Sequence, residues 1–368
     1  MEITDEIFKI AFANLHGIGP CRGAQLISKI GSVEEFFSLK PKELFLRTGI
    51  SKTILQNLNR DEAMREAERQ LSFNQKHGIK SLFFLDSNYP RRLKQCPDQP
   101  MILFSKGNFN VNNEKIVSVV GTRNQTDYGK IILEELIGSF SEMNIMVVSG
   151  LAYGVDISAH RLCLENNITT LGVLGHGLDR IYPAKHKNTA LKMLNQGGLI
   201  TEYGIGTNPD RENFPMRNRI VAGIADATIV IESKLKGGSI ITAELANDYS
   251  RDVFAFPGDV NRPYSEGCNK LIQQEKAHLV TNGVEFLNFM NWNIKESKPK
   301  QKVLFEHFDE QEKMILEILS NQSDLHMDVL SIRTGISASK MNVLLFNLEM
   351  KSAVKQLSGR RYRLSTSV

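Results

Sequence analysis

The feature that most constrains the fold is a regular alternation of short apolar segments with longer amphipathic segments in the middle of the chain. The apolar segments predict strands at 116–120, 145–149, 169–174, 199–202, 227–232, 252–257 and 278–281. The segments between them predict helices at 128–143, 154–166, 187–196, 214–225, 239–250 and 269–275. Because these strands are apolar on both faces, they must form a parallel sheet that helices cover on both sides. We therefore expect an α/β fold with an extended Rossmann-like parallel sheet as its core.

Glycines stand at the carboxyl ends of several predicted strands: Gly121, Gly150, Gly175 and Gly258. In open parallel sheets, ligands bind in the crevice outside this edge. The glycine positions therefore indicate where a binding site should lie.

The segments on either side of this core have different patterns. Residues 1–78 predict a small domain of short helices, in which the turn Gly17-Ile18-Gly19 is typical of a helix-hairpin-helix or SAM-like module. Such glycines allow backbone N–H groups to approach a DNA phosphate, but they also suit the tight turn of a plain helical bundle. The core is expected at 79–290, and it begins with two further strands in LFFLD and MILFSKG.

The C-terminal part predicts a second small domain. Residues 291–304 are polar and basic and indicate a linker. Residues 305–368 predict three helices followed by a hairpin around Ser358-Gly359, which is the order of a winged helix. Residues 351–368 contain five Lys or Arg and no Asp or Glu. A module of this kind either binds nucleic acid or serves as a protein-contact domain, and composition does not decide between the two.

Composition excludes several other classes of protein. The formal net charge is only +4, which by itself does not indicate nucleic-acid binding. The four cysteines are far apart, so we expect neither a zinc site nor a disulfide framework. No segment approaches the roughly 20 apolar residues of a membrane helix, and the start of the chain is not a signal peptide. We therefore expect a cytoplasmic protein with no membrane partner.

The glycine-rich loops do not match the common nucleotide-binding fingerprints. No G-x-G-x-x-G joins a predicted strand to a helix, which argues against a dinucleotide. No G-x-x-x-x-G-K-[ST] is present either, which argues against a P-loop nucleotide hydrolase. We expect no cofactor and no metal.

The loop Gly121-Thr122-Arg123-Asn124 instead has the chemistry of a phosphate grip. Glycine permits close backbone approach, while Thr122 and Asn124 supply hydroxyl and amide donors. Arg123 adds a fork of N–H donors suited to a phosphate. The helix that follows directs its N-terminal N–H groups to the same point. The sequence therefore predicts an anion site with no catalytic group.

Two more segments are candidates for the same site. Arg217-Asn218-Arg219 lies on a predicted helix, where residues two apart diverge, so one arginine can face the cleft while the other pairs with a carboxylate. Lys236-Gly237-Gly238-Ser239 forms a glycine-rich helix entry whose backbone N–H groups can bind phosphate.

The segment around Ser149 contains the residue types of a hydrolytic triad but lacks its geometry. Ser149 ends a strand without the G-x-S-x-G elbow. Asp156 and His160 are four apart, so they share a helix face and can bond each other. We interpret Ser149, Gly150, Gly154, Asp156 and His160 as a structural loop, and we expect no catalytic residues and no enzyme.

The motifs VVGTR, VVSGLAYGVDISAHR, VLGHGLDRIYP, FPMRNRIVAGIAD, GGSIITAELA and VFAFPGDVNRPYSEGCNKLI follow one another in this order. In order and spacing they closely resemble the DNA-processing protein A (DprA/Smf) family, from about Ser81 to Leu287. The resemblance implies single-stranded DNA in a basic pocket, with Arg123 and the Arg217–Arg219 segment on its phosphates. It also implies a homodimer that protects incoming DNA and loads the RecA recombinase during natural transformation.

One departure and one alternative accompany this resemblance. The end of the GCNKLI helix has Gln274-Glu275-Lys276-Ala277 where the family usually has Gly-Ala, and Glu275 is unfavourable near a DNA path. The segment GGSIITAE partly matches a motif of the lysine-decarboxylase-like nucleotide N-glycoside hydrolases, in which Glu244 would be the acid. Ile240 occupies the place of that motif's third glycine, which weakens this alternative.

Overall fold

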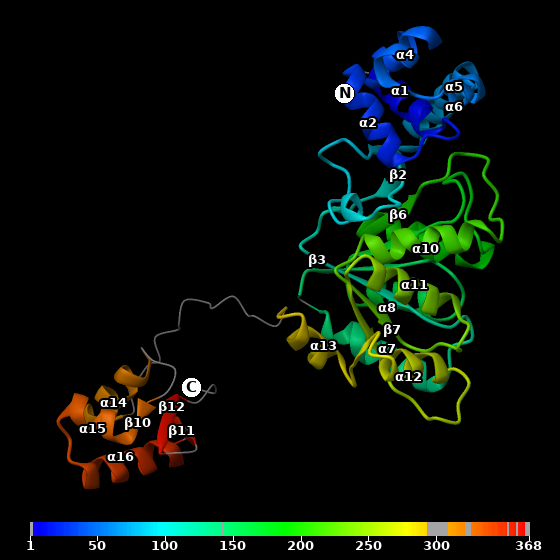
Figure 1. Ribbon diagram of the computed structural model, residues 1–368. Coiled ribbons are helices and arrows are strands. Elements are labelled where there is room, and N and C mark those ends of the chain that lie inside the picture. Colours follow the sequence, from blue (N-terminus) through cyan, green and yellow to red (C-terminus); the bar gives the residue numbers. More distant parts are fainter. Residues whose placement is uncertain are drawn as a thin grey trace. The chain divides into compact units, whose positions relative to one another are not determined.

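The structure is a computed structural model that describes residues 3–141, 143–292, 308–320, 325–351, 353–357 and 360–364. The chain divides into two compact units, Met1–Asn293 and Ile294–Val368 (Figure 1). Most of the predicted linker at 291–304 lies outside the described residues, and the domain boundaries stay predictions. None of the helices in the described ranges is long and apolar enough to cross a membrane.

The first unit is built on a nine-stranded sheet in the order β1-β2-β6-β5-β4-β3-β7-β8-β9. The strands are β1 (Lys80–Phe83), β2 (Ile102–Gly107), β3 (Lys115–Val120), β4 (Ile145–Ser149), β5 (Thr170–Val173), β6 (Gly197–Thr201), β7 (Ala227–Val230), β8 (Asp252–Ala255) and β9 (His278–Leu279). From β6 to β9 all neighbours are parallel, which confirms the predicted Rossmann-like core. The two entry strands add an antiparallel edge.

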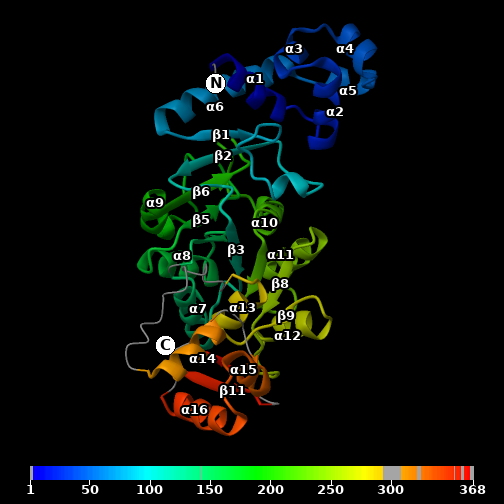
Figure 2. The same cartoon turned by 90° about the vertical axis from the view of Figure 1, so that its left-hand side faces the viewer.

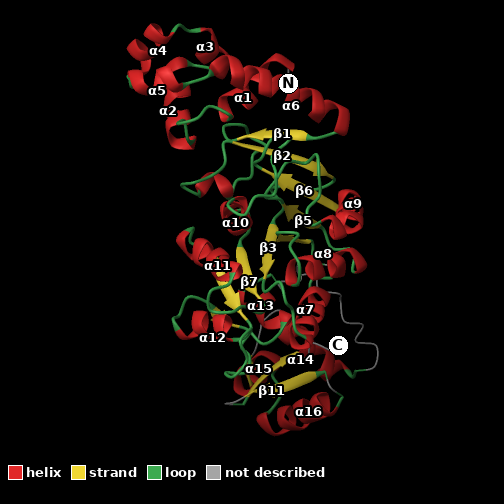
Figure 3. Cartoon of the chain, turned by 90° about the vertical axis from the view of Figure 1, so that its right-hand side faces the viewer, coloured by secondary structure: helices red, strands yellow, loops and turns green. Residues whose placement is uncertain are grey.

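Helices cover both faces of the sheet. The helices of this part are α7 (Asp127–Ser139), α8 (Val155–Glu165), α9 (Lys187–Gln196), α10 (Asn213–Gly223), α11 (Gly238–Asp248), α12 (Glu266–Gln273) and α13 (Gly283–Phe289). Figure 3 shows α10, α11 and α12 on one side of the yellow strands and α7, α8 and α9 on the other. The chain therefore forms the three-layer arrangement that two-sided apolar strands require.

Alternate residues of β3 supply the two cores. Ile116 is fully buried in a cluster with Ile220 of α10 and Ala243 of α11. Its neighbour Val117 is fully buried in a separate cluster with Leu133 of α7. Successive side chains of a strand point to opposite faces, so one strand supports both layers. Burying one such side chain contributes about 1.5–3 kcal/mol, so the central strand is a rigid base for the loops at its end.

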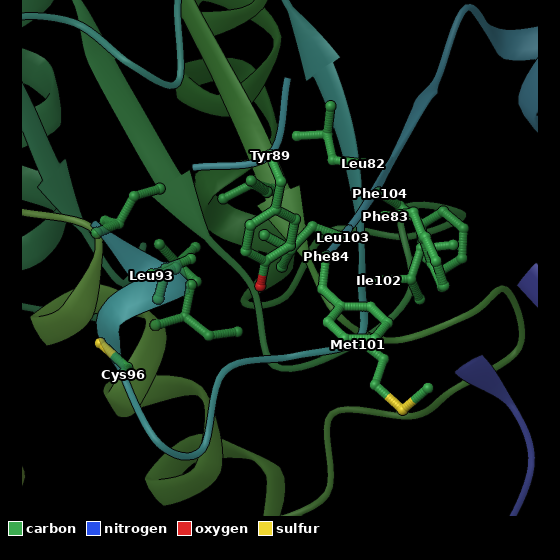
Figure 4. Close-up of a cluster of buried hydrophobic side chains, with 14 of the residues drawn as sticks. Leu82, Phe83, Phe84, Tyr89, Leu93, Cys96, Met101, Ile102, Leu103 and Phe104 are labelled. Atoms are coloured by element: carbon green, nitrogen blue, oxygen red, sulfur yellow. The ribbon is translucent and has the colours of Figure 1, made fainter. Parts of the chain in front are cut away.

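The N-terminal helices pack against the antiparallel edge of the sheet. They are α1 (Ile3–Ala13), α2 (Pro20–Ile30), α3 (Val33–Ser38), α4 (Pro41–Thr48), α5 (Lys52–Asn57) and α6 (Arg60–His77). Phe12 of α1 lies edge-on to Phe36 of α3 at 5.0 Å and to Phe83 of β1 at 6.4 Å between ring centroids. Figure 4 shows the buried hydrophobic side chains around β1 and β2, among them Phe83 and Phe104. The helices and the sheet thus share one continuous hydrophobic cluster.

Several element boundaries differ from the sequence predictions, and three of these differences are described here. Helix α7 ends at Ser139 rather than at 143, because the N–H of Phe140 bonds carbonyls only two and three residues back and the chain turns. Helix α12 begins at Glu266, three residues before the predicted start at 269. Strand β6 begins at Gly197 rather than at 199, and a Cβ there would lie 2.0 Å from the Thr170 carbonyl oxygen. Glycine, a poor strand former, is required at this position by the close approach of the neighbouring strand.

The second unit is a winged helix. Its elements are α14 (Glu310–Ser320), β10 (Leu325–His326), α15 (Met327–Thr334), α16 (Ala338–Met350), β11 (Val354–Leu357) and β12 (Arg361–Leu364). The predicted helices and hairpin are present, and β10 adds a third strand in the order β10-β12-β11. Leu316, Leu330 and Leu345, one from each helix, are fully buried in its separate core. The predicted turn at Ser358-Gly359 lies outside the described residues.

Candidate nucleic-acid interface

The strand order places a crevice at the carboxyl ends of β3 and β7. From β3 the chain adds β4, β5 and β6 on one side, and then it returns to add β7, β8 and β9 on the other. Crossovers that leave to opposite sides open a crevice at this switch point, which is where open α/β sheets bind ligands. A cleft of about 700 Å³ lies here, bordered by the loops after β3, β4 and β7 and by the start of α10. In Figure 2, α8 and α10 lie on opposite sides of β3.

The cleft brings together most of the residues that the sequence singled out for DNA binding. Those that line it are Gly121, Thr122, Arg123, Asn124, Arg217, Asn218, Lys236, Gly237, Gly238 and Ser239. Gly150 and Asp156 of the predicted structural loop line it as well. Segments more than 100 residues apart in the sequence therefore converge on one site.

The loop after β3 is fixed from beneath by the buried residue Glu232. The backbone N–H of Thr122 donates to the Glu232 carbonyl oxygen at 2.7 Å. The carboxylate of Glu232 accepts from the N–H and the hydroxyl of Thr126, at 2.9 and 2.6 Å. Gly129 leaves room for this carboxylate, because a Cβ there would lie 2.1 Å from Glu232 Oε2. Both ends of the loop are thus attached to one residue, which keeps Arg123 at the mouth of the cleft.

Gly154 allows two loops of the site to touch. Its φ of +75° lies in the left-handed region that favours glycine. A Cβ at this position would lie 2.2 Å from the Thr122 carbonyl oxygen. That same oxygen accepts from the N–H of Val155, the first residue of α8, at 3.2 Å. The predicted structural role of Gly154 therefore has a direct geometric basis.

Arg217 is the most deeply placed cation of the cleft. Only 5% of Arg217 is exposed, and its Nε has no hydrogen-bond partner among the described residues. Burial lowers the pKa of its guanidinium; the nearby Asp156 carboxylate opposes this effect, and Arg123 adds to it. Burial likewise raises the pKa of the Asp156 carboxyl, opposed by Arg217. A largely buried arginine in the lining of a cleft supplies a fixed positive charge and N–H donors, which suits an anion site.

The structure places Arg219 away from this cleft. Its Nη2 donates to Glu202 Oε2, and both side chains are largely buried. Burial raises the pKa of the Glu202 carboxyl, and Arg219 opposes that rise. The two arginines of the Arg217–Arg219 segment thus diverge as their helical spacing predicts: Arg217 faces the cleft and Arg219 pairs with a carboxylate.

The remaining residues of the predicted structural loop anchor it. Ser149 Oγ donates to the Val119 carbonyl oxygen at 2.7 Å. Asp156 Oδ2 accepts from the N–H of Ala152 at 3.3 Å. The predicted contact between Asp156 and His160 is replaced by another, since His160 Nδ1 lies 2.7 Å from Thr170 Oγ1 on the neighbouring strand. The Thr170 hydroxyl donates to a carbonyl oxygen, so it accepts from His160, whose Nδ1 carries the proton.

Aromatic side chains border the cations of the cleft. The Arg123 guanidinium lies 5.9 Å from the centroid of the Phe214 ring, and Tyr182 lies 6.0 Å from that ring. Lys234 Nζ lies 5.0 Å from the centroid of the Tyr264 ring. Cations over ring faces combine a phosphate-binding group with a surface on which a base can stack.

Sequence reasoning missed Arg211, Lys234 and Tyr264, all of which line the cleft. Lys234 follows the buried carboxyl end of β7, so strand position alone could have indicated it. Tyr264 lies in a loop distant in sequence, and its hydroxyl accepts from Asn124 Nδ2 at 3.2 Å. No local sequence signal predicts that contact. Tyr128 donates its hydroxyl proton to the Pro257 carbonyl oxygen and is not among the residues that line the cleft.

The start of α11 forms another wall of the cleft, in addition to the loops after β3 and β4 and the start of α10. Gly237, Gly238 and Ser239 line the cleft, and Asn218 Nδ2 donates to the Gly238 carbonyl oxygen at 3.4 Å. Ser239 Oγ donates to Ser233 Oγ at 2.8 Å, which fixes the helix start to the end of β7. The first N–H groups of a helix are available to an anion, and the dipole favours negative charge there.

The charged residues that line the cleft are mostly positive. Its described lining contains five lysine or arginine residues and one acid, the buried Asp156. Glu244, the suspected acid of a glycoside hydrolase, is absent from this lining and pairs with Lys276 at 3.1 Å beside a separate hollow. A search of the described ranges gives no group of three His, Cys, Asp or Glu that could hold a metal ion. The site therefore has the charge of an anion-binding groove.

Comparison with protein families agrees with this geometry. The model of DNA recombination-mediator protein A matches residues 80–291, and the model of the DprA winged helix domain matches residues 298–360. The chain belongs to the DNA recombination-mediator protein A (DprA/Smf) family. The first match spans the whole sheet and the cleft, so the candidate interface lies within the part that defines the DprA/Smf family.

Individual relatives cover most of the chain. Protein Smf of Escherichia coli (strain K12) is 32% identical over 317 residues, which is 82% of this chain and 84% of the relative. DNA processing protein DprA of Streptococcus pneumoniae (strain ATCC BAA-255 / R6) is 42% identical over 207 residues, which is 56% of this chain and 73% of the relative.

Two solved structures share the fold. The X-ray structure of DprA from Streptococcus pneumoniae aligns with a TM-score of 0.63 at 33% identity, over 78% of this chain and 98% of that one. DNA processing protein A from Helicobacter pylori aligns with a TM-score of 0.53 at 28% identity, over 58% and 95%. The Helicobacter protein is described as having a unique single-stranded DNA binding mode.

Proposed function

We propose that this chain binds single-stranded DNA in the cleft at the switch point of the sheet. In this proposal Arg123 and Arg217 bind the phosphodiester backbone together with the loop Gly121–Asn124 and the helix entry Lys236–Ser239. The observation that carries it is the buried Arg217, whose Nε has no hydrogen-bond partner among the described residues and which lines a cleft with four other cations and one acid. The described binding mode of the Helicobacter relative supports the choice of ligand.

The rim of the cleft favours unpaired bases. Phe214, Tyr182 and Tyr264 line it beside the cations. An aromatic ring stacks on a base only if the base is exposed, and such stacking contributes about 1–3 kcal/mol per base. In a duplex each base is already stacked and paired, so the rim gains little from it. Single strands should therefore bind much more tightly than duplexes of the same length.

A salt titration tests this proposal. Binding of a fluorescent 20-nucleotide oligonucleotide is measured by anisotropy from 50 to 300 mM NaCl, with the matched duplex as comparison. Arg123→Ala should weaken single-strand binding about tenfold and reduce the slope of log K against log salt by about 0.7, the value for one phosphate contact on a single strand. Equal affinity for single strand and duplex, or unchanged binding by Arg123→Ala, contradicts the assignment of this cleft.

We further propose that the cleft binds DNA without catalysis. One buried acid lies among its described lining residues, and Asp156 is already engaged by a backbone N–H and by the charge of Arg217. General acid–base chemistry on a glycosidic bond uses a pair of positioned carboxyl groups. Incubation with nucleoside monophosphates, followed by chromatography for free base, should show no release. Release that disappears in Glu244→Gln would instead favour the N-glycoside hydrolase.

The wider role is proposed from the family. We propose a cytoplasmic homodimer that protects incoming single strands and loads the RecA recombinase onto them during natural transformation. The match to the family model of DNA recombination-mediator protein A supports this role. A strand-exchange assay, in which single-stranded DNA is first coated with a single-strand-binding protein, tests it. The chain should shorten the lag before RecA-dependent exchange, and Arg217→Met should lose this effect together with DNA binding.

A further inference from the structure

We propose that Gln70 on α6 is a positioning residue for DNA binding, because it holds the loop that presents Arg211 to the cleft. Gln70 belongs to the N-terminal helices, for which the sequence patterns predict no role in the cleft. Its contacts place those helices against the segment between β6 and α10. This inference rests on the proposed function, since it concerns how one wall of the same cleft is kept in place.

Gln70 makes its contact through a side-chain amide whose oxygen and nitrogen both form hydrogen bonds. It is 4% exposed, and its Oε1 accepts from the backbone N–H of Ile205 at 2.7 Å. Its Nε2 donates to Asn74 Oδ1 at 2.7 Å, and Asn74 Nδ2 donates to Ser81 Oγ at 3.1 Å. Burying an amide is costly unless its hydrogen bonds are satisfied. This row of bonds from β1 to the loop fixes the direction in which Gln70 points.

The backbone of the loop is shaped to meet Gln70. A Cβ on Gly204 would lie 3.2 Å from Gln70 Oε1, so a glycine at this position lets the loop approach the helix closely. Beyond Ile205, the N–H of Gly206 donates to Asp179 Oδ1 at 3.2 Å. The Thr207 carbonyl oxygen accepts from the N–H of Gly177 at 3.3 Å. The loop is thus held from α6 on one side and from the loop after β5 on the other.

The same loop leads directly into the cleft. Pro209 and Arg211 line the cleft, and Phe214 follows at the start of α10. Arg211 is exposed, so its position depends on the backbone that carries it rather than on packing of its side chain. Loss of the bond at Ile205 removes the attachment of this loop to α6 and leaves only its attachment to the loop after β5, so Arg211 should spend less time at the phosphate. Gln70 therefore acts on DNA through Arg211.

A double-mutant cycle on the full-length protein tests this role. Gln70→Met keeps the size of the side chain and removes both hydrogen bonds. Its affinity for a 20-nucleotide oligonucleotide is compared with those of Arg211→Ala and of the double variant, at several salt concentrations. Gln75→Met is the matched control, since Gln75 lies exposed on the same helix. Gly204→Ala is a second variant, in which an added Cβ at 3.2 Å from Gln70 Oε1 should disturb the contact with Ile205 while the Gln70–Asn74–Ser81 bonds stay intact.

The losses of affinity caused by the substitutions at Gln70 and Arg211 should not add. Gln70→Met and Gly204→Ala should each weaken binding by about threefold or more in the wild-type background and have little effect when Arg211 is already alanine. Each should also lower the salt slope by about 0.7, as Arg211→Ala does, because one phosphate contact is lost. A residue that only supports the fold would lower the unfolding temperature and leave the slope unchanged.

The outcomes separate this inference from the proposed function. If the wild type does not prefer single-stranded DNA, the proposed function fails first. If the wild type binds and Arg211→Ala has no effect, or if the losses at Gln70 and Arg211 simply add, the role of Gln70 is overturned. Normal binding by both Gln70→Met and Gly204→Ala overturns it as well. Weakening by Gln75→Met to the same extent would assign the effect to the helix rather than to Gln70.

Discussion

The guanidinium of Arg217 occupies the space that a side chain on Gly150 would need. A Cβ atom built on Gly150 would lie 1.5 Å from Arg217 Nη1 and 2.4 Å from its Cζ. Gly150 directly follows β4 and Arg217 belongs to α10, so their contact joins the loop after one strand to the helix that forms the opposite wall. The absence of a side chain at position 150 is therefore what allows Arg217 to lie at the base of the cleft.

Gly150→Ala should displace Arg217 and weaken single-stranded DNA binding by about tenfold, since a hydrogen bond to a charged group contributes about 1.5–3 kcal/mol. Anisotropy with a 20-nucleotide oligonucleotide measures this loss. Gly138→Ala is the control, because Gly138 lies in α7 with nothing within 4 Å of an added Cβ. That variant should bind DNA normally and gain about 0.5–1 kcal/mol in stability. If Gly150→Ala binds DNA normally, the assignment of Arg217 to the DNA-binding site is contradicted.

Removal of Arg217 should make stability fall more steeply as pH rises. Burial already raises the pKa of Asp156, and Arg217 opposes that rise. In Arg217→Met the opposing charge is gone, so the pKa of Asp156 in the folded state rises further. The folded state then binds more protons than the unfolded state, and the added stability is present at low pH and lost as pH rises through the folded pKa.

Urea unfolding at pH 4.5 and 7.5 measures this effect. The free energy of unfolding of Arg217→Met should drop between these values by at least 1 kcal/mol more than that of the wild type, on the order of one pKa unit. The double variant Asp156→Asn/Arg217→Met should lose the extra pH dependence, because the titrating carboxyl is absent. An unchanged pH dependence in Arg217→Met would mean that solvent, rather than Arg217, stabilises the Asp156 charge.

Sequence patterns could predict the strands, the glycine loops and the position of the cleft, because each depends on local periodicity and on a general rule for parallel sheets. The helical spacing of Arg217 and Arg219 predicts that they diverge. It does not say which of them faces the cleft, since that depends on Glu202 at the end of β6. Likewise, His160 was expected near Asp156, but its partner is Thr170 on an adjacent strand. Pairings between elements distant in sequence are set by packing, which local patterns do not contain.

The His160 ring should stay neutral at pH values well below the usual pKa of histidine. Burial lowers its pKa to about 3, and the charge of Arg217 contributes to this shift. Unfolded histidine titrates near 6.5, so below that pH the unfolded state binds more protons than the folded state. The stability linked to His160 is therefore fully present above pH 6.5 and is lost as pH falls from 6.5 toward 3.

Nuclear magnetic resonance of the ring nitrogens tests this directly. The His160 signals should show a proton on Nδ1 and no titration between pH 7.5 and 5. His160→Gln should reduce the loss of unfolding free energy between pH 6.5 and 5 by about 1–2 kcal/mol relative to the wild type. A ring that titrates near pH 6 would contradict burial of His160 beneath the cleft.

Glu275 follows the end of α12 in a backbone conformation that favours glycine. The N–H of Lys276 bonds the Leu271 carbonyl oxygen and the N–H of Glu275 bonds that of Ile272, which is the Schellman pattern that ends a helix. Glu275 has a φ of +56°, in the left-handed region that favours glycine. Glu275→Gly should therefore raise the free energy of unfolding by about 0.5–1 kcal/mol, as measured by urea denaturation. Glu275→Ala is the control, since it removes the charge but keeps the Cβ, and it should give no such gain.

Because Glu275 does not line the cleft, both variants should bind single-stranded DNA as the wild type does. A gain in affinity shared by both variants would instead place the Glu275 carboxylate near the path of the DNA.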